Sequence, residues 1–173
     1  HSMEFARAAA EVCAANGIHV RIFESLRPTP ELSFAVREYD CQAGINVTAS
    51  HNPKEYNGYK VYWSDGAQLP PQHAAAIARE LEQIDIFTGI RRMEFDDAKA
   101  QGLIEIMGAE TDERFMSHVM AMVNDRESMA KVADTFHMVY TPFHGCGWKL
   151  VPEALRGLGV KHLHCVPEQM VLD

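Results

Sequence analysis

The chain alternates short apolar runs with stretches in which apolar residues recur every three or four positions. The short runs predict strands at Ile18 to Phe23, Ala43 to Ser50 and Gly58 to Trp63. A weaker pattern over 93–108 indicates one helical turn followed by a short strand. The helical spacing predicts four longer helices, at 2–16, 31–40, 70–84 and 111–123.

Residues with strong backbone preferences mark the ends of these segments. Ser2 is expected to cap the first helix and Gly17 to end it. "RPTP", Arg27 to Pro30, predicts a rigid turn, because proline fixes its own backbone angle. Thr111 is a candidate cap for the last of the four helices. The prolines precede the first turn of the 70–84 helix, and its apolar positions recur at helical spacing at Ala75, Ile77, Ala78, Leu81 and Ile84.

A second unit is expected to begin near Lys131. From 136 to 166 the pattern reads strand, glycine-containing loop, helix and strand, which predicts a parallel βαβ unit. Strands and helices also alternate before this point. The chain is therefore predicted to be an α/β protein made of two units.

Composition narrows the classes of partner. A formal net charge of -8 argues against nucleic acid, which requires a basic face. The apolar runs are strand-sized, far below the roughly 20 residues of a membrane-spanning helix. The four cysteines form no CxxC pair, which favours free thiols in a reducing compartment and hence a cytoplasmic location.

The stretch "TASHNP", Thr48 to Pro53, carries the candidate chemistry. Ser50 and His51 lie at the end of a predicted strand, where open α/β sheets hold their ligands. Pro53 restricts Asn52 to extended geometry and so stiffens the loop. A serine hydroxyl becomes a nucleophile when a neighbouring base or cation assists it, and His51 or a lysine could do so. A polar turn without chemistry is the alternative that these residue types leave open.

The longer stretch "TASHNPKEYNGYKVY" resembles the active-serine loop of the phosphohexomutases, the family of phosphoglucomutases and phosphomannomutases. "RPTPELSFAVRE", "NGYKVYWSDGAQ" and "YTPFHGCGW" are also similar to that family. The resemblance implies a mixed sheet with flanking helices in domain I, residues 1–108. Residues 109–173 would then hold a linker helix and the opening βαβ unit of a similar domain II.

The same resemblance implies a role for each loop residue. Ser50 would be the phosphoserine, which donates its phosphoryl group to a sugar monophosphate and recovers one from the resulting bisphosphate. His51 would contact the transferred group and Lys60 would act as acid or base at the reacting hydroxyl. The resemblance places the residues of the phosphate-binding loop at Thr48, Asn52 and Asn57.

Several motifs of the family are absent from the chain. These are the DxDxDR metal loop, the GEESG sugar loop and the RPSGTEPK-like phosphate loop. The resemblance implies Mg²⁺, with glucose 1,6-bisphosphate as activator, yet only the phosphoryl oxygen on Ser50 would be a ligand here, and hard cations need several oxygens. We therefore expect an inactive part of a longer cytoplasmic mutase that interconverts hexose 1-phosphate and 6-phosphate, with the remainder of its own chain as a partner.

Two other functions fit the same residues. A serine-dependent sugar phosphatase would use water as the acceptor, and a non-catalytic module would only bind a sugar phosphate. In "YTPFHGCGWKL", Gly145 and Gly147 could aim backbone N–H groups at a phosphate or could simply form a tight turn. His162 and His164 lie two apart on one predicted strand, so a metal site there would need ligands from elsewhere.

Overall fold

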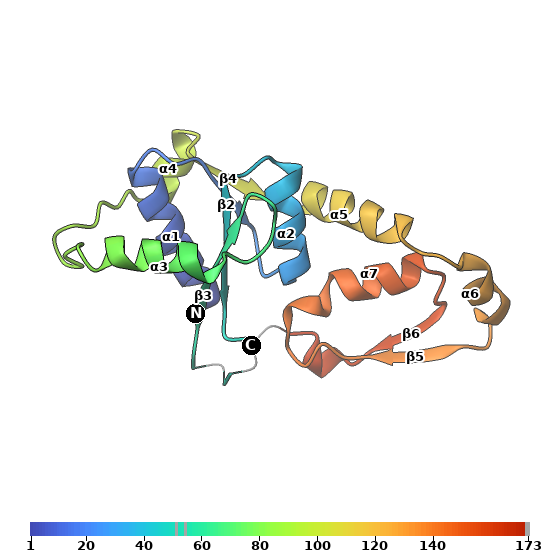
Figure 1. Cartoon of the computed structure of the whole chain (residues 1–173). Coiled ribbons are helices and arrows are strands. Elements are labelled where there is room, and N and C mark those ends of the chain that lie inside the picture. The colour runs from blue at the N-terminus through green and yellow to red at the C-terminus, as the bar shows by residue number, and fades with distance from the viewer. Residues whose placement is uncertain (51, 54, 172–173) are drawn as a thin grey trace. The chain divides into compact units, whose positions relative to one another are not determined.

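The computed structural model describes residues 1–50, 52–53 and 55–171 (Figure 1). The chain divides into two compact units, His1–Gly108 and Ala109–Asp173, which are described separately below. Within the described residues, no helix has both the length and the apolar character that crossing a bilayer requires.

The first unit begins with a helix, a strand, a second helix and a second strand. Gly17 ends α1 with a φ of 75°, a backbone angle that glycine adopts without steric cost, and its N–H donates to the Ala14 carbonyl. Pro28 caps α2, and Pro30 stands in its first turn, where a missing N–H costs nothing. The elements are α1 (Ser2–Ala15), β1 (Val20–Phe23), α2 (Thr29–Glu38) and β2 (Ala43–Thr48).

The rest of this unit completes two separate two-stranded sheets. β2 pairs with β3 in an antiparallel hairpin, with Asn46 opposite Lys60, while β1 pairs with β4 in parallel, with Val20 opposite Ile104. The expected mixture of parallel and antiparallel pairing is present, within an α/β arrangement of helices and strands. The remaining elements are β3 (Gly58–Trp63), α3 (Pro71–Leu81), α4 (Phe95–Ala100) and β4 (Ile104–Met107).

The core of the first unit is small and lies between α1, α4 and β4. Ala10, Ala14, Ala98 and Ile104 are buried there, and partly buried residues such as Ile22 pack around them. Alanine at these positions lets the two helices approach closely, because the side chain is a single methyl group.

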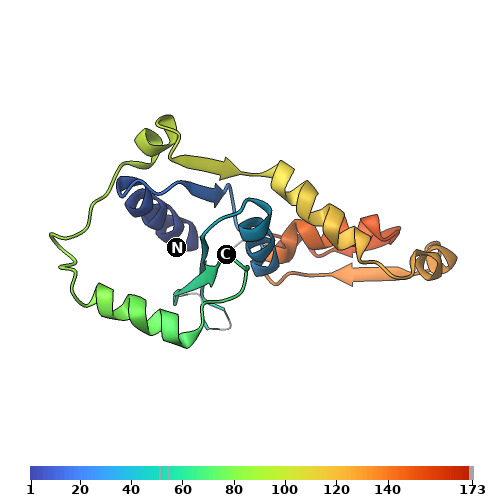
Figure 2. The ribbon, with the colours of Figure 1, turned by 45° about the horizontal axis from the view of Figure 1, so that its top comes forward.

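The helix predicted over 70–84 is present, and its apolar positions are exposed. α3 forms within the expected range, but none of its residues is buried, and Leu81 is 61% exposed. Figure 2 shows α3 standing apart from α1 and α4. Periodicity predicted the helix correctly; an apolar stripe is buried only where another surface covers it, and the described part of this unit supplies none to α3.

The second unit contains the predicted parallel βαβ arrangement. β5 and β6 pair in parallel through α7, with Met138 opposite Leu163. The predicted helix over 111–123 begins two residues earlier, so Thr111 lies in its first turn rather than at its cap. A further helix follows, capped by Asp125, whose side chain accepts from the Ser128 N–H at 2.9 Å. The elements are α5 (Ala109–Ala121), α6 (Arg126–Val132), β5 (His137–Tyr140), α7 (Leu150–Gly157) and β6 (His162–Cys165).

Candidate functional site

The serine loop begins directly after the last residue of β2. Ser50 is exposed and has a φ of 57°, a left-handed backbone that residues other than glycine rarely adopt. Its N–H donates to Oγ1 of Thr48 at 3.0 Å, which ties it back to the strand end. Because such backbone strain persists only where the surroundings impose it, the loop holds Ser50 in a defined place.

Two backbone hydrogen bonds shape the loop beyond Ser50. The Asn52 N–H donates to the Ala49 carbonyl at 3.1 Å, and the Tyr56 N–H donates to the Pro53 carbonyl at 3.0 Å. Pro53 therefore stands at the start of a second turn. Both turns bring the chain back to Gly58, where β3 begins opposite Thr48.

The hairpin puts Thr48, Asn46 and Lys60 on one face, because directly opposed residues of an antiparallel pair share a face and alternate residues return to it. Lys60 is half-buried. Asn46 Nδ2 donates to Oγ1 of Thr29, the first residue of α2, at 2.8 Å. This face of the hairpin therefore meets the amino end of α2, where backbone N–H groups give a partial positive charge.

The Asn57 side chain is hydrogen-bonded to a residue at the start of the chain. Ser2 Oγ donates to Asn57 Oδ1 at 3.0 Å. The prediction that Ser2 caps α1 was wrong: His1 holds the cap position, and the serine hydroxyl is used across the fold instead. This contact fixes the far end of the serine loop to α1.

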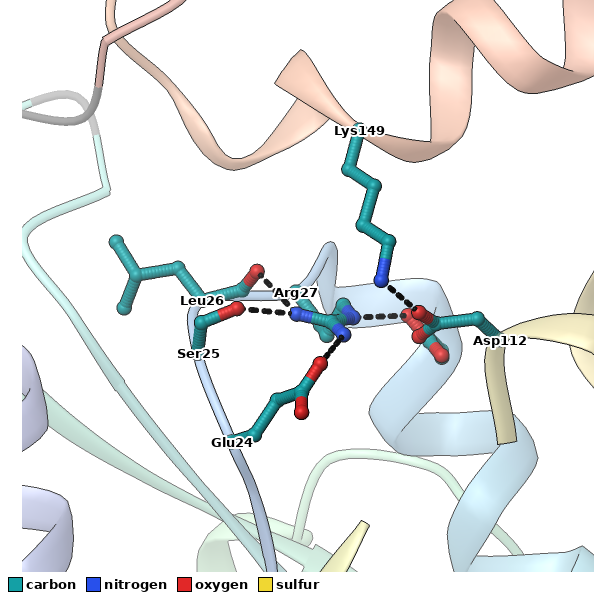
Figure 3. A network of polar contacts seen from close by, with 7 residues as sticks. Glu24, Ser25, Leu26, Arg27, Asp112 and Lys149 are labelled. Atoms are coloured by element: carbon teal, nitrogen blue, oxygen red, sulfur yellow. Dashed lines mark hydrogen bonds and ion pairs between the residues drawn. The ribbon is translucent and has the colours of Figure 1, made fainter. Parts of the chain in front are cut away.

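Arg27 organises the segment between β1 and α2 (Figure 3). Its guanidinium donates to Ser25 Oγ at 2.5 Å and to Glu24 Oε1 at 3.1 Å, and it lies 3.9 Å from Glu31 Oε2. A guanidinium with several acceptors is a rigid anchor. Since α2 starts two residues later, Arg27 fixes the helix end to which Asn46 is bonded.

Of the predicted site residues, the structure brings Thr48, Ser50, Asn52, Asn57 and Lys60 onto one hairpin and its loop. His51 lies outside the described residues. Sequence reasoning missed the supporting contacts of Arg27, Thr29 and Asn46. "RPTP" and the polar Asn46 within an apolar strand were the available signals, although neither indicates which residues would meet.

A magnesium site does not form from the residues that the structure describes. They contain no group of three or more His, Cys, Asp or Glu side chains that could hold a metal ion, in either unit. A phosphoryl oxygen on Ser50 would supply one ligand, so the donor set does not fit a bound Mg²⁺ on this part of the chain.

The glycine loop of the second unit is a tight turn. The Gly145 N–H donates to the Pro142 carbonyl at 2.9 Å, and Tyr140 Oη donates to the Gly147 carbonyl at 3.0 Å. A Cβ on Gly147 would lie 2.6 Å from that hydroxyl, so the glycine is needed for packing. Lys149, two residues after Gly147, forms an ion pair in which its Nζ lies 2.6 Å from Asp112 Oδ2 (Figure 3). The rings of His162 and His137 stack with their centroids 4.4 Å apart. Among the described residues, no group of three possible metal ligands includes His162.

Comparison with known proteins agrees with the serine-loop motif. Residues 1–86 match the family model described as phosphoglucomutase/phosphomannomutase, alpha/beta/alpha domain I. A phosphoglucomutase of Staphylococcus aureus (strain MRSA252) is 35% identical over 178 residues, which cover 99% of this chain and 30% of that protein. The phosphoglucomutase of Staphylococcus saprophyticus is 34% identical over 168 residues, which cover 97% of this chain and 30% of the relative.

A solved structure shows the same fold. The crystal structure of a protein from Thermus thermophilus, described as a phosphomannomutase, matches 96% of this chain and 35% of its own, with a TM-score of 0.73 at 24% identity. The chain thus spans about a third or less of the proteins it matches. Residues 1–86 thus match domain I of the phosphoglucomutase/phosphomannomutase family, and relatives named phosphoglucomutase match the chain along nearly its whole length.

Proposed function

We propose that the whole protein is a phosphosugar mutase that interconverts hexose 1-phosphate and 6-phosphate, with glucose as the first sugar to test, and that Ser50 carries the phosphoryl group. The observation that supports this most directly is the exposed Ser50, held just past the end of β2 on a strained backbone within the family's domain I. A hydroxyl fixed in this way can meet a substrate without first ordering its loop.

In the proposed reaction, the bond between phosphorus and Ser50 Oγ breaks as a hydroxyl oxygen of the sugar monophosphate bonds to phosphorus. The sugar hydroxyl gives up its proton to Lys60, which we propose as the base. Ser50 Oγ leaves as an alkoxide. The resulting bisphosphate turns over, this alkoxide bonds to the phosphorus of its other phosphoryl group, and the sugar oxygen released from that phosphorus takes the proton back from Lys60. Glucose 1,6-bisphosphate would load Ser50 in the first instance.

Positioning and positive charge are what a phosphoryl transfer requires from a protein, because its transition state is loose and anionic. The hairpin supplies Lys60, and the loop supplies the Thr48 hydroxyl and the Asn52 and Asn57 side chains, with His51 assigned to the transferred group by resemblance alone. Mg²⁺, when bound in the whole protein, would neutralise phosphoryl charge with ligands from outside the residues described here. We infer that this chain by itself has no mutase activity.

The location proposed is the cytoplasm, where the four free cysteines would stay reduced. The partner proposed is a small sugar phosphate, and the net charge of -8 leaves this chain without the basic field that nucleic acid requires.

Intact-mass measurement of the full-length protein after incubation with glucose 1,6-bisphosphate tests the proposal. One added phosphoryl group is expected, and it should be absent in Ser50→Ala. If the phosphoryl group were added both to the unmodified protein and to Ser50→Ala, another residue would be the carrier. Release of inorganic phosphate without isomer formation would instead identify a phosphatase, and binding without either product a non-catalytic module.

A further inference from the structure

The second unit carries two histidines at the amino ends of its paired strands. His137 is the first residue of β5 and His162 the first residue of β6, and the parallel register puts them opposite each other (Figure 1). Their ring planes are inclined by only 12°, with the centroids 4.4 Å apart. Both residues are exposed, and both line a cavity of about 330 Å³. Two imidazoles are therefore presented together to the solvent.

One hydrogen bond fixes the position of the ring proton on His162. Its Nε2 lies 3.1 Å from the Asp134 carbonyl oxygen. A carbonyl oxygen only accepts, so in the neutral ring Nε2 carries the proton and Nδ1 keeps its lone pair. Histidines that bind metal ions are almost always held in this way, because a second ring nitrogen that donates to a carbonyl or carboxylate orients the ring and raises its basicity. His162 thus already has the outer contact of a metal ligand.

The charges around the pair do not exclude a cation. Lys161 precedes His162 and lines the same cavity, but its Nζ lies 2.6 Å from Asp134 Oδ1. The hydrogen bond from Lys161, and then its positive charge, lower the pKa of Asp134, so this carboxylate is ionised at neutral pH. The lysine charge at this end of the sheet is therefore balanced by a carboxylate.

We propose that His137 and His162 form a two-histidine site for a divalent transition-metal cation, such as Zn²⁺ or Cu²⁺. Imidazole nitrogen is a preferred ligand of these ions. The described residues contain no group of three possible ligands, so water would occupy the remaining positions.

The spacing of the two rings is close to what such an ion requires. With bonds of about 2.0–2.1 Å, two ligand nitrogens of a tetrahedral Zn²⁺ lie about 3.3 Å apart. The rings of His137 and His162 stand 4.4 Å apart, centroid to centroid. The torsion between Cβ and a histidine ring has a broad energy minimum, so small rotations bring the nitrogens together without moving the strands.

The position of the pair indicates a structural cation rather than a catalytic one. Parallel α/β units bind their substrates beyond the carboxyl ends of the strands, and the pair lies at the opposite, amino ends. A cation held by one residue from each strand would tie β5 to β6. It would therefore bind the folded second unit in preference to the unfolded chain. The inference concerns this unit alone and does not depend on the proposed mutase activity.

The test titrates Zn²⁺ into the 173-residue chain at about pH 7.5, above the ordinary histidine pKa of about 6.5, so that the rings are neutral. The histidine ring carbons are labelled with ¹³C and followed by NMR. The His137 and His162 signals, assigned from the two alanine variants, should shift together with one Kd below about 1 mM. Mg²⁺ is the control ion and should leave both signals unchanged, because a hard cation prefers oxygen ligands.

Substitutions distinguish the pair from exposed histidines in general. His137→Ala should weaken Zn²⁺ binding at His162 by at least about 10-fold, the smaller loss expected when even an outer contact of a metal site is removed. His164→Ala is the matched control and should leave the Kd unchanged. His164 is also exposed and shares the strand and the face of His162, but it lies opposite Val139 rather than a histidine. Since both substituted residues are exposed, neither change removes core packing.

Amide hydrogen exchange tests whether the cation ties the strands together. Where exchange requires the second unit to unfold, Zn²⁺ at about 100 times its Kd should slow exchange in β5 and β6 by about 100-fold. The amides of β1 and β4, in the first unit, are the internal control and should exchange at an unchanged rate.

Four results would overturn the inference. The first is the absence of a saturable shift at His137 and His162 up to about 1 mM Zn²⁺. The second is a different Kd for each ring, which would mean that each imidazole binds alone. The third is an equal loss of affinity in His164→Ala and His137→Ala. The fourth is Zn²⁺ binding at the pair without slower exchange in β5 and β6, which would remove the structural role.

Discussion

Ser50 holds its hydroxyl on a backbone that glycine adopts more easily. Left-handed geometry at a residue other than glycine costs on the order of 1–3 kcal/mol. Both Ser50→Gly and Ser50→Ala remove the hydroxyl and should prevent phosphorylation. We expect Ser50→Gly to exceed Ser50→Ala in free energy of unfolding by about 1 kcal/mol, after allowing for the larger chain entropy of unfolded glycine. Urea titration of the two variants measures the difference, and equal stabilities would mean that the loop relaxes.

The bond from Asn46 to Thr29 links the serine strand to the amino end of α2. Asn46→Ala should lower the free energy of unfolding by about 0.5–1 kcal/mol, and a double-mutant cycle with Thr29→Ala should assign most of that loss to the pair. In the full-length protein it should also slow loading of Ser50 from glucose 1,6-bisphosphate. Asn16→Ala is the matched control, because that side chain also donates at 2.8 Å, to the Val12 carbonyl, away from the serine loop.

These residue contacts show how far the sequence could predict the site. "TASHNP" placed a serine after a strand, and the structure has Ser50 in that position. The sequence did not show that Asn46 would bond Thr29 or that Ser2 would bond Asn57, because both pairs depend on how separate elements pack. Ser2 was assigned to the nearer role, as a helix cap, since local spacing was the only information available.

Among the elements, α6 depends on its capping carboxylate. Hydrogen bonds from the Ser128 side chain, and then from its N–H, lower the pKa of Asp125. A depressed pKa in the folded state means that the stabilisation is present above the unfolded value of about 3.9 and is lost as pH falls through the lower folded value. Exchange of the Ser128 amide should therefore show extra opening below about pH 4. Asp125→Asn should remove this pH dependence; a variant that kept it would place its origin elsewhere.

The turn between β5 and α7 is closed by a contact that leaves no room for a side chain at Gly147. Gly147→Ala would place a methyl group 2.6 Å from Tyr140 Oη and should destabilise the second unit by about 1–3 kcal/mol. Adding Tyr140→Phe removes the clashing oxygen. The double variant should therefore lose less free energy of unfolding than the two single variants lose in sum. Thermal unfolding of all three variants measures the coupling, and strict additivity would show that the hydroxyl is not the obstacle.

At the scale of elements, the sequence predicted where helices and strands form better than it predicted how they pair or which surfaces cover them. The parallel β5–α7–β6 unit follows from alternation, helical spacing and glycine positions, as do β2 and β3 as separate strands. The antiparallel pairing of β2 with β3 and the exposure of α3 do not follow, because periodicity indicates which face of an element is apolar and not which other element covers it or pairs with it.

At the scale of the whole molecule, one segment of the first unit leaves several large apolar side chains exposed to water. Between α3 and α4, Ile84, Ile86, Phe87 and Ile90 are between 44% and 89% exposed. Contiguous exposed apolar residues promote association. We therefore expect the isolated chain to bind a hydrophobic dye and to form larger species as its concentration rises.

Phe87→Ser, at the most exposed of these four positions, should reduce both effects without loss of stability, because its side chain has few contacts to lose. Met122→Ser is the control: Met122 is 80% exposed but lies in the second unit, away from this segment in the sequence. Light scattering and dye fluorescence over a concentration series compare the variants. If both substitutions act equally, general surface hydrophobicity explains the association. If only Phe87→Ser acts, the segment from Ile84 to Ile90 is the cause.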